Sequence, residues 1–581
     1  MARAPADCVV KHARWVNVHS GEVLPDTTIA IASGRFASVG DDVEPRVGPD
    51  TVVIDAEGRF AVPGLCDAHM HVESGMVTVT EFARAVLPYG TTSMFIDPHE
   101  IANVLGLPGV RLMHDEALAA PSNVFVQVPS CVPSAPGLEH AGAVFGPDEI
   151  AEAMTWPGII GLGEVMNFPG VAAGDPRMMG EIAAAMRAGK TVGGHYASRD
   201  LGTAFHGYVA GGAADDHEGT QAEDAIARVR QGMRAMLRLG SAWYDVAEQI
   251  RAVTERGIDP RYIILCTDDC HSGTLVNEGH MDRVVRHAIS QGVAPIAAIR
   301  MATLNTAEHF GLERELGSIT PGRRADFILM RDLARFEAED VFIRGHRAAS
   351  KRKLALDVPA YDYPDWSKRT MNLSRDLSAS DFDLKTNASA TTATVNVIGV
   401  VENQAPTQAR TIDLPIANGI VAADPSNDVC HAALVERHRA SGTVVNGFVQ
   451  GFGYDRPCAL ASTVAHDSHH MIVVGTSKAD MALAANRLRA VGGGVAFFAD
   501  GAELALIELP IAGLMSDDRA ESVAAKAEKL GAAMRACGCT LNNAFMQHSL
   551  LALVVIPELR ISDVGLVDVR TFEVVDVVVS T

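Results

Sequence analysis

The segment Ala61–Gly75 contains the pair of residues in this chain that most clearly points to chemistry. Its sequence, AVPGLCDAHMHVESG, is an apolar run that ends in His69 and His71. If the run is a strand, alternate side chains share one face and both imidazoles point the same way. Two imidazoles at a strand end form half of a divalent metal site. Such a pair alone also fits two surface histidines, so the metal interpretation needs partners elsewhere in the chain.

Further polar residues stand where later apolar runs stop. In chain order they are Asp97, His99 and Glu100, then Glu164, His195, Asp215, Asp216, His217 and Glu218, and finally Asp268, Asp269 and His271. Taken one at a time, residues of these types after a strand often cap helices or face solvent. Their joint occurrence at the ends of several runs predicts a metal site.

The set of ligands indicates two ions. The candidates for one ion are His69, His71 and Asp268, those for the second are His195 and His217, and Glu164 is placed between them. Nitrogen and carboxylate ligands without thiolate suit Mn(II), Fe(II) or Zn(II), and we expect Mn(II) or Fe(II) first. Two ions about 3.5–4 Å apart can share a hydroxide that is nucleophilic at neutral pH. Asp268 would then move the proton to the leaving group; we prefer it to Asp269 because it comes first at the strand end.

These positions require a set of strands whose ends meet. The expected strands are LCDAHMH, TTSMFIDP, NVFVQVPS, GIIGLGEV, TVGGHY, GGAADDHE, MRAMLRLG and YIILCTDD. Helical segments such as GEIAAAMRAG and QAEDAIARVRQG separate them. Eight such units predict an α/β fold, a (β/α)8 barrel with its active site at the carboxyl ends of the strands. The seventh segment is rich in Arg and Met and could instead be helical.

The barrel is expected to span residues 61–315 and to carry two further parts. The pattern of residues 1–60 predicts short strands separated by glycine-containing turns. Residues 316–362 are again expected to form β-structure and to complete the same small domain. Residues 363–392 are polar and connect to a C-terminal domain over 393–581, which mixes strands and helices as α/β or α+β.

Composition limits the classes of function. The 581 residues are 48% hydrophobic and 21% charged, an ordinary globular balance for about three domains. A net charge of −22 argues against nucleic acid and anionic membranes as partners. Nine scattered cysteines without a CxxC pair predict a reducing compartment. The first residues, MARAPADCVV, lack the apolar core of a signal peptide, so we expect a soluble cytoplasmic protein.

Longer stretches of the chain carry a family resemblance. PGLCDAHMH, followed later by strand-end His, His and Asp, resembles the amidohydrolase superfamily. A finer resemblance, to the bacterial adenine deaminases, covers nearly the whole chain, including NGFVQGFG and VAHDSHHMIVVG near its end. It also rests on HVESGMVTVTEFARAVLPYGTT, IDPHEIANVLG, PSCVPSAP, GLGEVMNFPGV, DDHEGT, CTDDCHSG and IRMATLNTAEHFGL.

The resemblance implies hydrolytic deamination of adenine to hypoxanthine and ammonia by a metal-bridged hydroxide, in a homo-oligomeric enzyme whose partner is a small purine. It implies the ligands His69, His71, Glu164, His195, His217 and Asp268, with Glu164 bridging where many superfamily members use a carboxylated lysine. Asp268, Glu100 and Glu218 are the expected catalytic residues. Asp97, His99, Asp269 and His271 are expected to bind substrate or relay protons.

Two loops depart from the family pattern. After His195 the chain reads Tyr196-Ala197-Ser198 in place of Ala-Pro-Gly, and after Asp269 it reads Cys270-His271-Ser272 in place of Arg-His-Pro. Both loops are expected near the pocket, so another 6-aminopurine or a cyclic amide is the alternative substrate. A binding protein with a decayed site is a third hypothesis, and the complete ligand set argues against it.

A second polar cluster lies in the C-terminal region. The sequence HDSHH places His466, Asp467, His469 and His470 close together. They could contribute to the mouth of the active site or form a second metal-binding patch. Alternatively, they form a turn with a capping Asp and exposed histidines.

Overall fold

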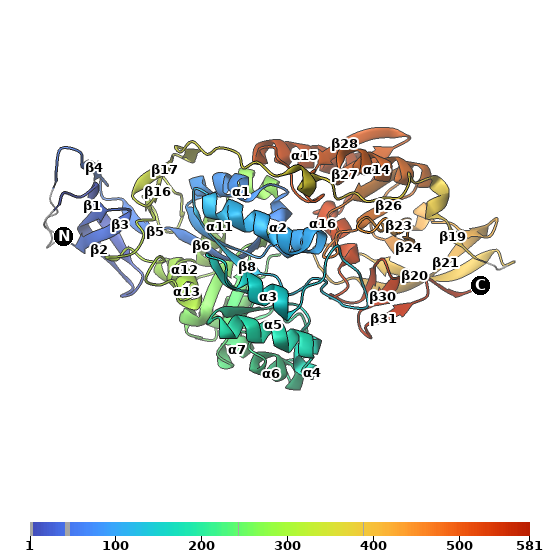
Figure 1. The fold of residues 1–581 in the computed structure, drawn as a ribbon, viewed down its shortest axis with the longest axis horizontal. Helices are drawn as coiled ribbons and strands as arrows, with labels where there is room; N and C mark the ends of the chain where they lie inside the picture. Colours follow the sequence, from blue (N-terminus) through green and yellow to red (C-terminus); the bar gives the residue numbers. More distant parts are fainter. Residues whose placement is uncertain (1–3, 41–46, 242, 387–388) are drawn as a thin grey trace.

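The computed structural model describes residues 4–40, 47–241, 243–386 and 389–581. Figure 1 shows three parts in a row along the long axis: a blue N-terminal sheet, a central domain of strands and helices, and an orange-to-red C-terminal domain. The N-terminal sheet and the C-terminal domain lie at opposite ends of the molecule. Among the described helices, none has both the length and the apolar character needed to span a bilayer.

The central domain contains a strand at each of the eight expected positions. They are β6 (Leu65–His71), β7 (Thr91–Ile96), β8 (Asn123–Val128), β9 (Ile159–Val165), β10 (Thr191–Gly194), β11 (Asp215–Asp216), β12 (Arg234–Arg238) and an eighth in two pieces, β13 (Ile263–Cys266) and β14 (Asp268–Asp269). The Arg- and Met-rich seventh segment is β12, so its helical alternative is wrong. Strands β6 to β10 pair in order, β11 to β13 pair in order, and β14 pairs in parallel with β6. The domain therefore has a (β/α)8-like fold.

The fifth and sixth strands are shorter than the sequence pattern predicts. Between them, side-chain carboxylates replace part of the backbone ladder. Asp215 Oδ1 accepts a hydrogen bond from Gly194 N at 3.0 Å, and Asp216 Oδ2 accepts one from Tyr196 N at 2.5 Å. One backbone bond also joins the two strands, from Ala214 N to Val192 O at 2.9 Å. His217 and Glu218 consequently follow β11 in a loop.

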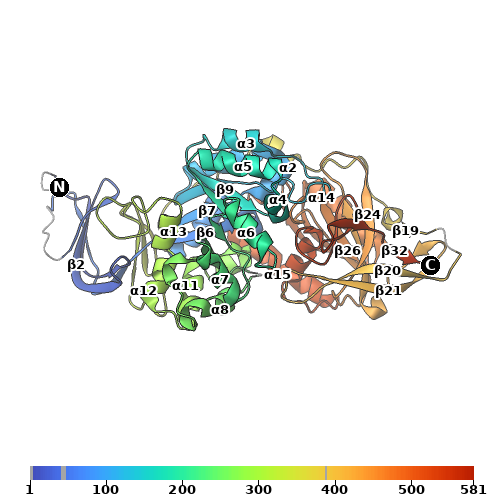
Figure 2. The same ribbon diagram turned by 90° about the horizontal axis from the view of Figure 1, so that it is seen from below.

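Helices cover the outside of the strands (Figure 2). They include α1 (Val79–Val86), α2 (His99–Ala119), α3 (Pro147–Ala153), α4 (Phe168–Ala173), α5 (Pro176–Arg187), α6 (Thr203–Ala210), α7 (Ala222–Arg230), α8 (Val246–Gln249), α10 (Ser272–Asn277), α11 (Met281–Ser290), α12 (Pro295–Met301) and α13 (Leu304–His309). Strands β7 and β8 are buried at every position. Parallel strands that are covered on both faces are buried along their whole length, which explains this pattern.

Strands from both flanks of the central domain share one N-terminal sheet. The first flank supplies β1 (Cys8–Asn17), β2 (Glu22–Ala32), β3 (Arg35–Gly40), β4 (Val52–Asp55) and β5 (Phe60–Pro63). The second supplies β15 (Phe327–Met330), β16 (Asp340–Ile343), β17 (His346–Ser350) and β18 (Lys353–Leu354). The two sets join where β5 pairs antiparallel with β15. The central domain is thus inserted between two halves of one sheet.

The C-terminal domain is built on a large, mostly antiparallel sheet, which favours the α+β description. Its strands are β19 (Leu384–Lys385), β20 (Thr392–Gly399), β21 (Gln408–Ala417), β22 (Ile420–Val421), β23 (Val429–Val435), β24 (Val444–Gln450), β25 (Cys458–Ser462), β26 (Met471–Gly475), β27 (Gly494–Ala499), β28 (Ala502–Glu508) and β32 (Val578–Ser580). Helix α14 (Lys478–Val491) packs on β25 and β27, and α15 (Ala520–Ala536) packs on β28. The segment after residue 362 also packs here, since Leu373, Leu377 and Phe382 are buried with α14.

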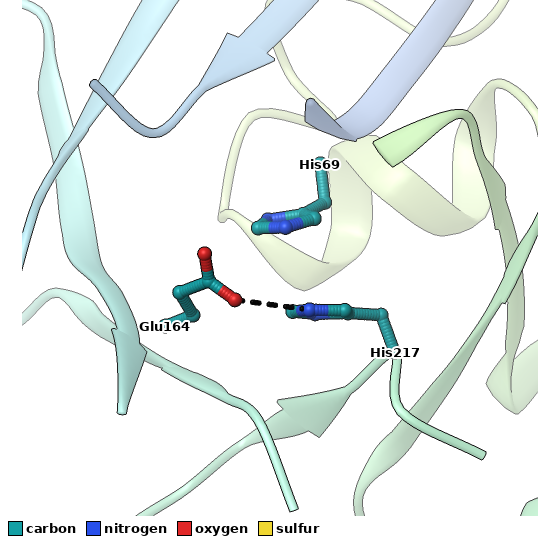
Figure 3. A group of neighbouring side chains, drawn as sticks. All are labelled: His69, Glu164 and His217. Carbon is teal, nitrogen blue, oxygen red and sulfur yellow. Dashed lines mark ion pairs between the residues drawn. The ribbon is translucent and has the colours of Figure 1, made fainter. Parts of the chain in front are cut away.

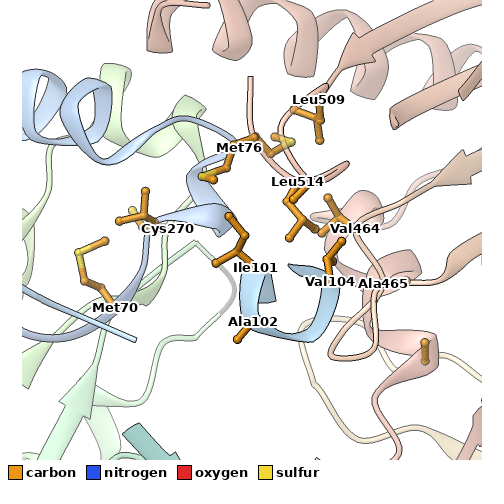
Figure 4. Close-up of a cluster of buried hydrophobic side chains, with 14 of the residues drawn as sticks. Met70, Met76, Ile101, Ala102, Val104, Cys270, Val464, Ala465, Leu509 and Leu514 are labelled. Atoms are coloured by element: carbon orange, nitrogen blue, oxygen red, sulfur yellow. The ribbon is translucent and has the colours of Figure 1, made fainter. Parts of the chain in front are cut away.

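The central and C-terminal domains share one hydrophobic core (Figure 4). Met76, Ile101 and Val104 of the central domain lie near Val464 and Leu514 of the C-terminal domain in this view. Polar contacts cross the same boundary: Tyr363 Oη donates to Glu116 Oε2 at 2.6 Å, and Ala520 N donates to Glu81 Oε1 at 2.8 Å. This packing fixes the C-terminal domain against the carboxyl ends of β6 and β7.

Candidate metal centre

Imidazoles from three strand ends surround the carboxylate of Glu164, which lies near the end of β9. Glu164 Oε2 accepts a hydrogen bond from His195 Nδ1 at 2.6 Å and lies 3.1 Å from His217 Nε2. Glu164 Oε1 lies 3.4 Å from His71 Nε2. Figure 3 shows the carboxylate beside the parallel rings of His69 and His217. Glu164 is therefore positioned between the two predicted groups of ligands.

The three residues predicted to hold one ion lie together. The ligand atoms of His69, His71 and Asp268 are within 4.8 Å of one another, and all three residues are buried. His71 Nε2 lies 3.4 Å from Asp268 Oδ1. This proximity follows from the pairing of β14 with β6, which brings residues about 200 positions apart side by side.

The second group contains more ligand candidates than the sequence assigned to it. His195 and His217 lie within 4.8 Å of a carboxylate oxygen of Glu218. His99, which the sequence assigned to substrate binding or proton relay, also stands at the centre. Its Nδ1 is 3.2 Å from Glu164 Oε1, and it forms a further group with His71 and Glu164.

The donor set fits divalent metal ions. His69 Nε2 and His195 Nε2 are buried without a hydrogen-bond partner among the described residues, which is rare for polar atoms. Burial opposes protonation of His71, but Asp268 and Glu164 outweigh it and raise the pKa of this imidazole well above its usual value. A field that favours a proton at that nitrogen also favours a cation there. Buried nitrogen and carboxylate donors around Glu164 therefore suit divalent ions.

Asp97 lies behind the ligands and orients two of them. Its Oδ2 accepts a hydrogen bond from Glu164 N at 2.8 Å, and its backbone oxygen lies 3.0 Å from His71 Nδ1. Fixing one imidazole nitrogen in this way directs the other toward the centre. A side chain at Gly163 would overlap the Asp97 carboxylate, so only glycine allows this approach. Asp97 does not line the cavity beside the centre.

Arg238 on β12 is a site residue that the sequence analysis missed. Its side chain is 1% exposed, and Nη1 donates to Asp268 Oδ2 at 2.9 Å and pairs with Glu218. Its Nε donates to Asp245 Oδ2 at 3.0 Å, and the guanidinium lies 4.4 Å from the Trp243 ring centroid. One cation thus holds two of the predicted catalytic carboxylates. The available signal was a charged residue inside a strand whose neighbours are apolar.

The HDSHH segment of the C-terminal domain reaches the same centre. His466 Nδ1 lies 3.5 Å from Glu100 Oε1, and Asp467 Oδ1 lies 3.5 Å from His99 Nε2. His469 and His470 are buried as well, and His470 Nε2 contacts His140 O at 2.9 Å. Residues 466–468 do form a turn, but the expectation of exposed histidines is wrong, because all four polar side chains are buried.

The remaining predicted residues lie around a small network. Ser74 Oγ donates to Asp269 Oδ1 and lies 3.2 Å from Glu100 Oε1. Asp269 Oδ2 accepts a hydrogen bond from Trp243 Nε1 at 3.1 Å. His271 Nδ1 lies 3.1 Å from Ser74 O, and its side chain lines a separate pocket of about 780 Å³. Asp269 thus lines the cavity beside the centre, whereas His271 lines the separate pocket.

The cavity beside the centre has one polar wall and one apolar wall. Its volume is about 30 Å³. The polar residues are His71, His99, Glu164, His195, His217, Glu218, Asp268, Asp269, His466 and Asp467. The other wall consists of Met166, Trp243, Leu550, Leu553 and Ile556. Residues 196–198 and 270–272, where the chain departs from the family pattern, are not in this lining.

Comparison with known protein families assigns a family to each of the two large domains. Residues 60–348 match the amidohydrolase family, and residues 404–573 match the adenine deaminase C-terminal domain. An adenine deaminase of Mesorhizobium japonicum is 70% identical over 100% of this chain and 96% of the relative. Adenine deaminase 3 of Rhizobium meliloti is 67% identical over 100% and 97%, and an adenine deaminase of Moorella thermoacetica is 49% identical over 99% and 96%. The chain belongs to the adenine deaminase family.

Proposed function

We propose that this protein catalyses the hydrolytic deamination of adenine to hypoxanthine and ammonia. The observation that carries the proposal is the buried Glu164 carboxylate, which lies within 3.4 Å of imidazole nitrogens on both of its oxygens. It stands in a chain that aligns over its full length with adenine deaminases.

We infer that two divalent ions occupy this centre. His69, His71 and Asp268 would hold one, His195 and His217 the second, and Glu164 would be shared. Buried nitrogen and oxygen donors suit Mn(II) or Fe(II), with Zn(II) as the alternative. When bound, the ions supply Lewis-acid activation of the attacking water.

Carboxylates of the chain then transfer the protons. Water adds at C6 of adenine, the bond from C6 to the amino nitrogen breaks, and a proton must reach the departing ammonia. Asp268 is suited to carry it, because Arg238 holds Oδ2 at 2.9 Å while Oδ1 faces the imidazole of His71. Glu218 lines the same cavity, and the same guanidinium orients its carboxylate.

Glu100 is better described as a positioning residue than as a catalytic one. It does not line the cavity and acts through its contacts with Ser74 and His466. Burial, reinforced by the neighbouring Glu73, raises the pKa of its carboxyl well above the usual value. The raised pKa favours the neutral form of this carboxyl, which leaves the charge of the centre to the ligands.

The test is a substrate panel with the metal-loaded enzyme. Adenine, other 6-aminopurines and a cyclic amide are incubated separately, and both ammonia and the ring product are measured. We expect hypoxanthine and ammonia in equal amounts from adenine. Turnover of a cyclic amide with none of adenine would overturn the proposal.

A further inference from the structure

The cavity beside the centre is much smaller than a purine ring. Its volume is about 30 Å³, whereas holding a single water requires at least about 10–15 Å³ of such space. It therefore does not admit a purine ring in this conformation. A ring that reaches the metal ligands must displace the apolar wall of the cavity and remain in contact with it.

That wall comes largely from one short segment of the C-terminal domain. Leu550 begins the 3-10 helix η7 (Leu550–Ala552), and Leu553 and Ile556 follow at intervals of three residues. All three line the cavity, whereas Leu551, in the same turn, is buried in the core shared by the two domains. Pockets that bind small flat molecules typically combine an apolar wall with a few fixed polar groups.

A buried arginine holds this segment at both ends. Arg560 is 1% exposed; its Nη1 donates to Leu550 O at 2.7 Å and its Nε donates to Ile556 O at 2.8 Å. Its Nη2 donates to Ala405 O at 2.6 Å, which ties the segment to the loop before β21. In the described part of the chain, its polar partners are backbone carbonyls rather than carboxylates.

We propose that Leu553 determines which purines this enzyme accepts, and that Arg560 is the positioning residue that sets the distance of Leu553 from the metal centre. This inference rests on the proposed function. It assigns the C-terminal domain a role in substrate selection, in addition to its contribution of His466 and Asp467.

The decisive variant is Leu553→Ala in the full-length, metal-loaded enzyme, with Leu551→Ala as the matched control. Both variants lose the same buried volume from the same segment, but only Leu553 faces the cavity. The substrates are adenine and 6-aminopurines that carry an added group at C2, C8 or N9. Metal content and Tm are measured on each sample.

We expect Leu553→Ala to raise the KM for adenine about 10-fold with a smaller change in kcat, because apolar contacts of this size contribute about 10–200-fold to discrimination. The ratio of kcat/KM for at least one larger purine to that for adenine should rise about 10-fold. Leu551→Ala should lower Tm and leave this ratio within about 2-fold. Arg560→Lys, which cannot reach all the carbonyls, should shift selectivity in the direction of Leu553→Ala.

The outcomes separate this inference from the function on which it rests. If the wild type does not deaminate adenine, the proposed function fails and the inference falls with it. If the wild type does so and Leu553→Ala has the same selectivity as Leu551→Ala, only the inference is overturned. If Arg560→Lys does not fold, the comparison of Leu553→Ala with Leu551→Ala still tests the inference.

Discussion

Asp467 of the C-terminal domain faces His99 of the central domain, with its Oδ1 3.5 Å from the imidazole Nε2. The opposite nitrogen of the same ring, Nδ1, lies 3.2 Å from Glu164 Oε1. Burial opposes protonation of His99, but Asp467 and Glu164 outweigh it and raise the pKa of His99 to about 10. The centre is thus assembled from two domains, although its principal ligands all come from one.

Asp467→Asn should lower kcat/KM for adenine about 10–100-fold, because groups that orient a ligand of a metal centre have effects of this size. The amide keeps the shape of the side chain but removes the charge that orients His99. Asp563→Asn is the control, since Asp563 is an acid of the same domain that contacts His140 and His470 rather than the centre. Equal activities of the two variants would contradict the assigned role of Asp467.

Arg238→Lys should lower kcat about 100-fold while most of the metal is retained. A lysine ammonium keeps the charge but cannot reproduce the planar fork that contacts Asp268, Glu218 and Asp245 together. The measurement is kcat for ammonia release, with metal content determined on the same sample. Wild-type kcat in Arg238→Lys would show that the two carboxylates need no common partner.

Glu139→Gln should make the protein more stable at alkaline pH. Burial raises the pKa of Glu139 to about 8, and its Oε1 accepts hydrogen bonds from Ser134 Oγ at 2.7 Å and Ala135 N at 2.9 Å. The unfolded carboxyl releases its proton near its ordinary pKa of about 4.5. The stability that Glu139 contributes is therefore fully present below about pH 4.5 and is lost as the pH rises through about 8.

The glutamine variant has no proton to lose and keeps an acceptor for both donors. Its free energy of unfolding should exceed that of the wild type by at least about 1 kcal/mol at pH 8.5, since one pKa unit corresponds to about 1.4 kcal/mol. The difference should shrink toward pH 5. Glu152→Gln, at an exposed position on α3, is the control for the Glu-to-Gln substitution itself. A pH-independent difference for Glu139→Gln would contradict this explanation.

Much of the central domain could be predicted from the sequence because its signals are local. Each strand is an apolar run that stops at a polar residue, and parallel pairing brings those stops to one end of the sheet. Thus the spacing of His69 and His71, and the Asp268–Asp269 pair, pointed to the centre before any contact was known. Even β12 was located, although its arginines obscured the pattern.

The contributions of Arg238, Trp243 and the C-terminal domain could not be predicted in the same way. Arg238 pairs with two carboxylates because its long side chain lies inside the barrel between Glu218 and Asp268. This contact depends on the relative positions of three strands. His466 and Asp467 reach the centre only because a hydrophobic core joins two domains about 370 positions apart in sequence. Leu553 lies in an ordinary apolar stretch, and only its position beside the metal cavity distinguishes it from Leu551.

The most direct test of the central claim compares metal binding and adenine deamination in the wild type and in Glu164→Gln. Metal-free protein is titrated with Mn(II), and bound metal and ammonia release are followed together. We predict that wild-type activity reaches its plateau at about two ions per chain, and that Glu164→Gln loses bound metal and at least about 99% of activity together, because one buried carboxylate serves both ions. Full metal content and full activity in Glu164→Gln would contradict the shared role of Glu164.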